Sequence, residues 1–307
     1  MGNTSPVDVG TRTEPVAGHP RRGPARALLV AMRPRQWIKN LLVFAVPAAA
    51  RELADADVLV DTGLAFLAFC LASAGTYLLN DVADREADRV HPFKRHRPIA
   101  AGELSPGAAT GAAVISLLLA CAVALLASPG LLLVVAAYVG LTTAYSRALK
   151  HVPIFDIAAV ASGFFLRAVA GGVAADLFIS KWFLILAGGG SMFIVTAKRY
   201  AELREAPDGA SRRVLAEYSE DYLRALLATI AGVIVVAYCI WSFEDRGNGT
   251  AWPTAASAVP FVLGIMRYGL LVDQGHGEEP EAVLLGDRTL LGLAAACFAL
   301  LALGTVL

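Results

Sequence analysis

The 307-residue chain has few charged residues and no excess of either sign. Asp, Glu, Lys and Arg make up only 17% of it and hydrophobic residues 57%, whereas an average soluble domain carries roughly 25% charged residues. The 26 basic residues balance the 26 acidic ones. The net charge therefore gives no reason to expect a nucleic-acid partner, and the composition favours a membrane protein.

The chain also lacks several common catalytic and metal-binding motifs. Its four cysteines lie singly inside apolar runs, without the CxxC spacing of zinc or redox sites, so we interpret them as small packing residues. There is no HExxH zinc motif and no GxSxG nucleophile motif. The five histidines show no ligand spacing. Chemistry that depends on an activated serine, cysteine or histidine is therefore not expected.

Long uncharged runs are present instead. No charged residue occurs from Leu104 to Ser146, and only Ser128-Pro129-Gly130 interrupts this stretch. A membrane crossing needs about 20 apolar residues in a helix, so the stretch predicts two transmembrane helices joined by a tight turn. The same criterion predicts an all-α, polytopic membrane protein, a nine-helix bundle with a central cavity open to the cytosol. Its spans are expected near residues 37–50, 61–79, 108–127, 130–146, 153–174, 178–197, 222–243, 251–272 and 288–307.

The distribution of Lys and Arg predicts the orientation. With the N-terminus in the cytosol, 20 basic residues fall in cytosolic segments and three, Arg51, Lys181 and Arg246, on the other side. The long loops 80–107 and 197–221 then both face the cytosol. Residues 1–25 lack the apolar core of a signal peptide and are predicted to be a disordered tail. Residues 26–307 form the predicted catalytic membrane domain.

An acidic cluster lies at the end of the second predicted span. On a continuous helix, Asn80, Asp84 and Asp88 share one face, and Asp81 lies beside Asp84. Carboxylates on adjacent turns repel one another, and they lose solvation at the membrane boundary. Mg²⁺ offsets both effects, because it binds carboxylates together with phosphate oxygens. We therefore predict these four residues as Mg²⁺ ligands. The alternative is a solvated helix end neutralised by nearby arginines.

Cations follow the acidic cluster and recur in other cytosolic segments. Lys94, Arg95 and Arg97 come directly after the carboxylates, and metal carboxylates beside a basic loop predict a diphosphate site. An intramembrane carboxylate, Asp156, is a functional candidate by default. Arg167 lies three turns further on, too far to pair with it. Further substrate-binding candidates at the predicted cytosolic ends are Lys39, Asn80, Tyr145, Lys150, Lys198, Arg199, Tyr200 and Glu202. Snorkelling or anchoring at the interface is the alternative for the lysines and Arg199.

These motifs resemble a known family. NDxxDxxxD at 80–88, followed by HPxKxxRPI at 91–99, resembles the first signature of the UbiA-type intramembrane prenyltransferase superfamily. The resemblance implies nine transmembrane helices, a cytosolic active site and Mg²⁺-dependent diphosphate chemistry. Residues 33–40 (RPRQWIKN) and 280–288 (PExxLLxDR) are similar to the decaprenyl-phosphate phosphoribosyltransferase branch. That branch works in the bacterial inner (plasma) membrane and moves 5-phosphoribose from phosphoribosyl diphosphate (PRPP) to a polyprenyl phosphate, for cell-wall arabinan precursors.

The resemblance assigns catalytic roles to Asp81, Asp84 and Asp88, through the metal, and to Lys94 and Arg97, through the leaving diphosphate. One rival function is transfer of a prenyl group from a prenyl diphosphate to an aromatic or lipid acceptor. That function predicts a second Asp-rich motif after span six, where this chain has AKRYAELR at 197–204. The other rival is a transporter, which predicts internal repeats and broken helices. The acceptor's chain length and the oligomeric state, a homo-oligomer included, stay open.

Overall fold

The computed structural model describes residues 22–205, 213–244, 252–275 and 280–306. The predicted N-terminal tail lies outside these ranges except for residues 22–25, of which the last two begin the first helix. Every regular element in the described ranges is helical. The elements are α1 (Pro24–Ala31), η1 (Pro34–Phe44), α2 (Ala45–Ala50), α3 (Ala56–Ala83), α4 (Arg85–Val90), η2 (Lys94–His96), α5 (Pro106–Ala127), α6 (Pro129–Arg147), η3 (Leu149–His151), α7 (Phe155–Ala174), α8 (Lys181–Glu205), η4 (Arg213–Glu217), α9 (Glu220–Phe243), α10 (Trp252–Ala256), α11 (Ala258–Asp273), α12 (Pro280–Gly286) and α13 (Arg288–Val306).

Local sequence explains the main helix starts. The carboxylate of Asp55 accepts hydrogen bonds from two backbone N–H groups of the first turn of α3. Ser105 and Ser128 do the same, with one bond each, for α5 and α6, and proline follows each serine at the first helical position. The predicted tight turn is confirmed, since α5 ends at Ala127 and α6 begins at Pro129.

Six helices of the described part are long and apolar enough to cross a membrane: α3, α5, α6, α7, α9 and α10–α11 taken together. The apolar stretch of α13, Arg288–Gly304, is shorter, and α8 is long but does not meet the same criterion. The predicted first span is not a regular α-helix, because η1 is a 3₁₀ helix of 11 residues that carries Arg35 and Lys39. The prediction of nine spans is therefore not confirmed.

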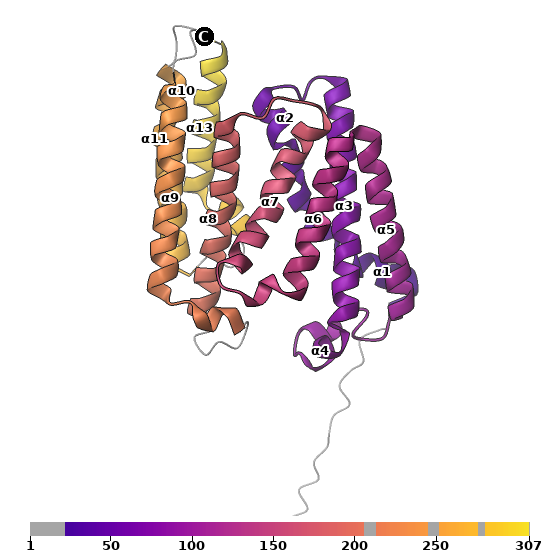
Figure 1. Cartoon of the computed structure of the whole chain (residues 1–307). Helices are drawn as coiled ribbons and strands as arrows, with labels where there is room; N and C mark the ends of the chain where they lie inside the picture. Colours follow the sequence, from indigo (N-terminus) through magenta and orange to yellow (C-terminus); the bar gives the residue numbers. More distant parts are fainter. Residues whose placement is uncertain (1–21, 206–212, 245–251, 276–279, 307) are drawn as a thin grey trace, which may run out of the picture.

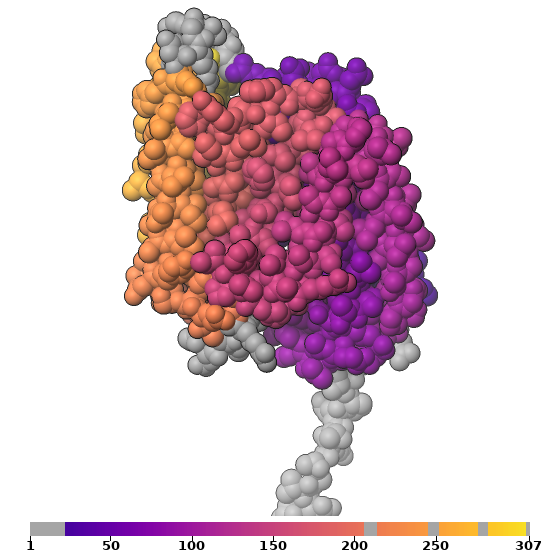
Figure 2. Space-filling model, viewed as in Figure 1, coloured from indigo at the N-terminus to yellow at the C-terminus, as the bar shows by residue number. Residues whose placement is uncertain are grey.

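The helices form two groups joined by α7 (Figure 1). On one side of α7 lie α3, α5 and α6; on the other lie α8, α9, α11 and α13. The space-filling view shows the segment from α6 to α8 covering the middle of this face (Figure 2). The polar segment at α4, the α6–α7 connection and the α8–α9 connection all lie at one end of the bundle (Figure 1), which we call the polar end. The predicted gathering of these segments is confirmed.

Two glycines of α7 allow an unusually close contact with the N-terminal segment. A Cβ at Gly171 would lie 1.9 Å from the carbonyl oxygen of Val43, and a Cβ at Gly172 would lie 2.5 Å from Cγ1 of Val46. Small residues permit such approach between helices in membranes. Elsewhere, large hydrophobic side chains such as Leu118, Leu126 and Leu133 are mostly exposed, as lipid-facing surfaces require.

Candidate active site

The side chains of the acidic cluster at the end of α3, which we call the first cluster, point in two directions. Asp81 is buried, and its Oδ1 accepts hydrogen bonds from Arg33 Nη2 at 2.5 Å and from Arg97 Nη1 at 3.1 Å. The same Arg97 nitrogen donates to Asp88 Oδ2 at 2.7 Å. Arg97 therefore bridges Asp81 and Asp88, and these two carboxylates hold it in a fixed position.

Asn80 and Asp84 line a separate cavity. It has a volume of about 90 Å³ and is closed by Thr143, Ser146 and Arg147 of α6. The expectation that Asp88 faces the same way as Asn80 and Asp84 is wrong, because its carboxylate accepts from Arg97 together with Asp81. α3 ends at Ala83 and α4 begins after Asp84. Asp88 lies seven residues, or about two helical turns, after Asp81, so these two side chains share a face.

No group of three or more His, Cys, Asp and Glu side chains within the described ranges is arranged to hold a metal ion. Two of the four predicted ligands, Asp81 and Asp88, face arginines instead. Asn80 and Asp84 present an amide and a carboxylate to one cavity. This small set of oxygen donors fits Mg²⁺, which commonly uses one or two carboxylates and completes its shell with water and phosphate oxygens.

A second buried cluster joins α6, α7 and α8. Arg199 Nε donates to Asp156 Oδ2 at 2.8 Å, and Arg199 Nη1 donates to Glu202 Oε2 at 2.8 Å. Arg199 Nη2 lies 3.5 Å from the hydroxyl of Tyr145. Four predicted substrate-binding residues thus come together. Two carboxylates already compensate the charge of Arg199, so it binds an added anion only if these pairs rearrange.

Tyr218 completes this cluster, although no pattern in the sequence pointed to it. Its hydroxyl donates to Asp156 Oδ1 at 2.6 Å and accepts from the backbone N–H of Ile154. Burial and the bond to Asp156 raise the pKa of Tyr218 above its usual value, so the hydroxyl stays protonated at neutral pH. Ile154 has a left-handed backbone, with φ 70°, a rare conformation for a β-branched residue.

Arg33 is the second residue that the prediction missed. It is the first residue of the RPRQWIKN motif at 33–40, which by itself indicates no contact with the acidic cluster. It has a left-handed backbone, with φ 55°, and its guanidinium lies over the ring of Tyr77, 4.7 Å from the centroid. Each cluster therefore contains or adjoins a strained non-glycine residue, as functional sites often do.

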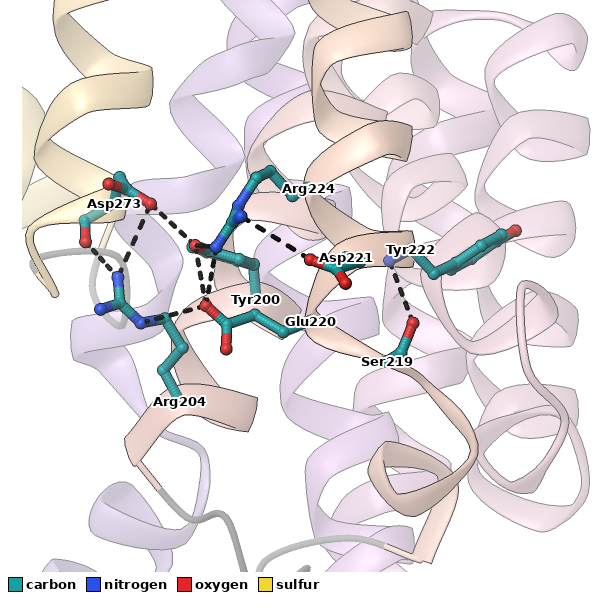
Figure 3. Close-up of polar contacts among 8 residues, drawn as sticks. All are labelled: Tyr200, Arg204, Ser219, Glu220, Asp221, Tyr222, Arg224 and Asp273. Carbon is teal, nitrogen blue, oxygen red and sulfur yellow. Dashed lines mark hydrogen bonds and ion pairs between the residues drawn. The ribbon is translucent and has the colours of Figure 1, made fainter.

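Tyr200 belongs to a third polar group, which Figure 3 shows. Its hydroxyl donates to Asp273 Oδ1 at 2.8 Å, lies 3.3 Å from Glu220 Oε1 and accepts from Arg224. Successive residues on an α-helix point about 100° apart, so Tyr200 cannot share the direction of Arg199. It links α8 to α9 and α11 instead, so it lies outside the second cluster, and its role in substrate binding stays a prediction.

The remaining predicted cations belong to the neighbouring segments. Lys94 and Arg95 are exposed in η2. Lys39 in η1, Lys150 in η3 and Lys198 on α8 are half-buried.

Arg167 lies deeper in the bundle. It donates to Asn40 Oδ1 and to the hydroxyl of Tyr138, both at 2.7 Å, and to the carbonyl of Gly163. Asp156 pairs with Arg199 instead, so the expectation that Arg167 does not pair with Asp156 is confirmed. These neutral partners tie η1 and α6 to α7, which indicates a structural role.

An apolar cavity of about 550 Å³ lies among α8, α9, α11 and α13. Its walls include Phe193, Phe261 and Leu301, and Leu284 and Leu290 lie where α12 leads into α13. The cavity volume falls within the range of about 300–1,000 Å³ that is usual for small-molecule sites. The lining suits a hydrocarbon ligand.

The fold is that of an intramembrane transferase bundle, and the family of the chain follows from its similarity to known proteins. Residues 41–293 match the UbiA prenyltransferase family. The chain belongs to this family. It is 42% identical to the decaprenyl-phosphate phosphoribosyltransferase of Corynebacterium glutamicum, over 90% of this chain and 86% of that protein. It is 41% identical to the enzyme of that name from Mycobacterium tuberculosis H37Rv, over 94% of this chain and 97% of that protein.

Solved structures support the fold. A UbiA homolog from Archaeoglobus fulgidus, solved with DMAPP and Mg²⁺, matches with a TM-score of 0.68 and 16% identity, over 90% of this chain and 99% of that one. A digeranylgeranylglyceryl phosphate synthase matches with a TM-score of 0.63 and 14% identity, over 92% and 99%. At such identities the likeness defines the fold alone.

Proposed function

We propose that the chain transfers 5-phosphoribose from PRPP to the phosphate of a polyprenyl phosphate and releases diphosphate. The observation that carries this proposal is the 41–42% identity, over nine-tenths of the chain, to proteins named decaprenyl-phosphate phosphoribosyltransferase. The AKRYAELR segment supports it, because Arg199 and Glu202 form an internal ion pair where the rival prenyltransferase function expects carboxylates for a second metal. The 20-to-three bias of basic residues favours a bacterial inner-membrane protein with its polar end and N-terminus in the cytosol.

The first cluster is the proposed diphosphate site. Asn80 and Asp84 would hold Mg²⁺, which supplies positive charge to the diphosphate oxygens when bound. Arg147 borders the same cavity. Arg97 is already paired with Asp81 and Asp88, so it would stabilise the charge of the leaving group once one of these pairs opens toward the diphosphate. Lys94 adds a second cation from the same loop.

The reaction needs no protein nucleophile. A lipid phosphate is already anionic at neutral pH, so one of its oxygens attacks the anomeric carbon while the bond from that carbon to the diphosphate oxygen breaks. Attack from the opposite face inverts the configuration at this carbon. The Tyr145 and Glu202 side chains of the second cluster are the proposed contacts for the ribose hydroxyls. The apolar cavity is the proposed site for the part of the polyprenyl chain nearest its phosphate.

The experiment is a transfer assay with purified full-length protein, labelled PRPP, Mg²⁺ and decaprenyl phosphate. We expect label to move into the lipid phase. Asp84→Asn should abolish transfer, whereas Asp221→Asn, a change at an exposed aspartate of the polar end, should leave it intact. Transfer only from a prenyl diphosphate to an aromatic acceptor would establish the rival function.

A further inference from the structure

One ion pair joins the two helices that form a wall of the apolar cavity. Asp287 lies between α12 and α13, and its Oδ2 accepts from Arg267 Nη2 of α11 at 2.7 Å. Its Oδ1 accepts from Arg267 Nε at 3.4 Å and from the backbone N–H of Leu290 at 2.8 Å. The carboxylate thus caps α13 and fastens the start of this helix to α11.

This pair lies beside the cavity's end. Leu284 and Leu285 precede Asp287 in the chain, Leu290 follows it, and all three line the cavity. The C-terminal end of α13 lies at the end of the bundle opposite the polar end (Figure 1), so the start of this helix points toward the polar end. The pair therefore adjoins the lining residues nearest to the proposed transfer site, and we call this end of the cavity the cavity mouth.

The chemistry of the mouth fits one kind of ligand. An apolar interior that reaches toward the polar end suits an amphiphile whose chain enters the cavity and whose anionic head stays at the polar end. Among the two substrates of the proposed function, only the lipid phosphate has a chain. The motif at 280–288 also gains a role here, since it contains Leu284, Leu285 and Asp287.

We propose that Arg267 and Asp287 are a positioning pair that fixes the mouth and so makes the enzyme select its acceptor by the isoprenoid chain. This inference rests on the proposed function. Loss of the pair lets the start of α13 move away from α11. The cavity then fits the chain less well, while the diphosphate site on α3 keeps its geometry.

The test compares decaprenyl phosphate with geranyl phosphate at saturating PRPP. The ratio of kcat/KM for the long over the short acceptor should fall about tenfold in Arg267→Gln and in Asp287→Asn, the scale of discrimination that apolar contacts supply. The KM for PRPP should stay unchanged. The double variant should fall no further than either single variant, because both remove one interaction. Arg288→Gln removes the neighbouring exposed cation and should keep the wild-type ratio.

An unchanged ratio in both single variants, or an equal loss with both acceptors, would overturn the proposal. A second measurement does not depend on turnover. Native mass spectrometry shows how much decaprenyl phosphate the intact protein retains. We expect both single variants to retain less of the lipid than wild type and Arg288→Gln to retain as much. If the wild type and Arg288→Gln retain the lipid better than the two single variants while the wild type transfers nothing from PRPP, the proposed function is wrong. The role of Arg267 and Asp287 in binding the lipid is then kept.

Discussion

Arg199 and Asp156, 43 residues apart in the chain, form a buried ion pair at 2.8 Å that joins α8 to α7. Their side chains are 2% and 1% exposed. A pair so isolated from water persists only when further hydrogen bonds satisfy both partners, and Glu202 and Tyr218 supply these bonds. The second cluster is therefore a rigid unit on which a substrate group can be oriented.

Asp156→Ala should destabilise the protein strongly. The change leaves Arg199 Nε and the Tyr218 hydroxyl buried without their acceptor, and breaking a buried pair costs about 3–5 kcal/mol. Thermal unfolding in detergent checks this, with Asp221→Asn as the control. The side chain of Asp221 is 94% exposed, so its loss should change stability by less than about 1 kcal/mol. Equal melting temperatures for the two variants would show that the pair contributes little.

Tyr218→Phe should remove two hydrogen bonds, to Asp156 and from the Ile154 N–H, at a cost of about 1 kcal/mol each. It should also remove a dependence of stability on alkaline pH. The folded state raises the pKa of Tyr218 above its unfolded value of 10.0. This stabilisation is fully present below the unfolded pKa and is lost as the pH rises from there through the folded pKa. The free energy of unfolding should therefore fall less steeply above about pH 10 in the variant than in wild type. Identical pH profiles for the variant and wild type would show that Tyr218 does not cause the alkaline loss of stability.

Arg97→Lys should impair turnover even though it keeps the charge. Lysine cannot reproduce the planar geometry of the guanidinium that Asp81 and Asp88 hold. Steady-state kinetics should show kcat/KM for PRPP reduced about 100-fold, the scale for losing one oriented charge stabiliser. Arg89→Lys is the matched control, because Arg89 pairs with the exposed Glu86. Comparable kinetics for the two variants would contradict the assigned role of Arg97.

Gly171→Ala should move the N-terminal segment. The added methyl group would lie 1.9 Å from the carbonyl oxygen of Val43, and overpacking of this kind costs about 1–3 kcal/mol. Because η1 begins directly after Arg33, activity should fall as well. Gly190→Ala, which meets nothing within 4 Å, should be neutral or stabilise α8 by up to about 1 kcal/mol. If both variants melt alike, the close contact is not tight.

The sequence predicts the parts of the site that depend on local pattern. Apolar run lengths and the Ser128-Pro129-Gly130 turn give the helices around it, and charge bias gathers Asp84, Arg97 and Arg199 at one end. The directions of individual side chains cannot be predicted in this way. Arg97 takes Asp88 together with Asp81 rather than leaving it beside Asp84. One step along α8 turns Tyr200 away from Arg199.

Contacts between segments that are far apart in the chain cannot be predicted from local pattern either. Arg33 reaches Asp81 across 48 residues, and Tyr218 reaches Asp156 across 62. No spacing rule connects such pairs, because only the packing of whole helices brings them together. The clearest available signal was chemical: Arg33 belongs to a motif rich in cations that precedes a carboxylate cluster.

The central claim is transfer of phosphoribose onto a lipid phosphate, and the anomeric configuration of the lipid product tests it most directly. Nuclear magnetic resonance of the product formed by purified protein from PRPP and decaprenyl phosphate should show configuration opposite to that of PRPP. The product should be absent with Asp84→Asn and present with Asp221→Asn. Retained configuration, or no phosphoribosyl lipid from an enzyme that does convert a prenyl diphosphate, would contradict the account.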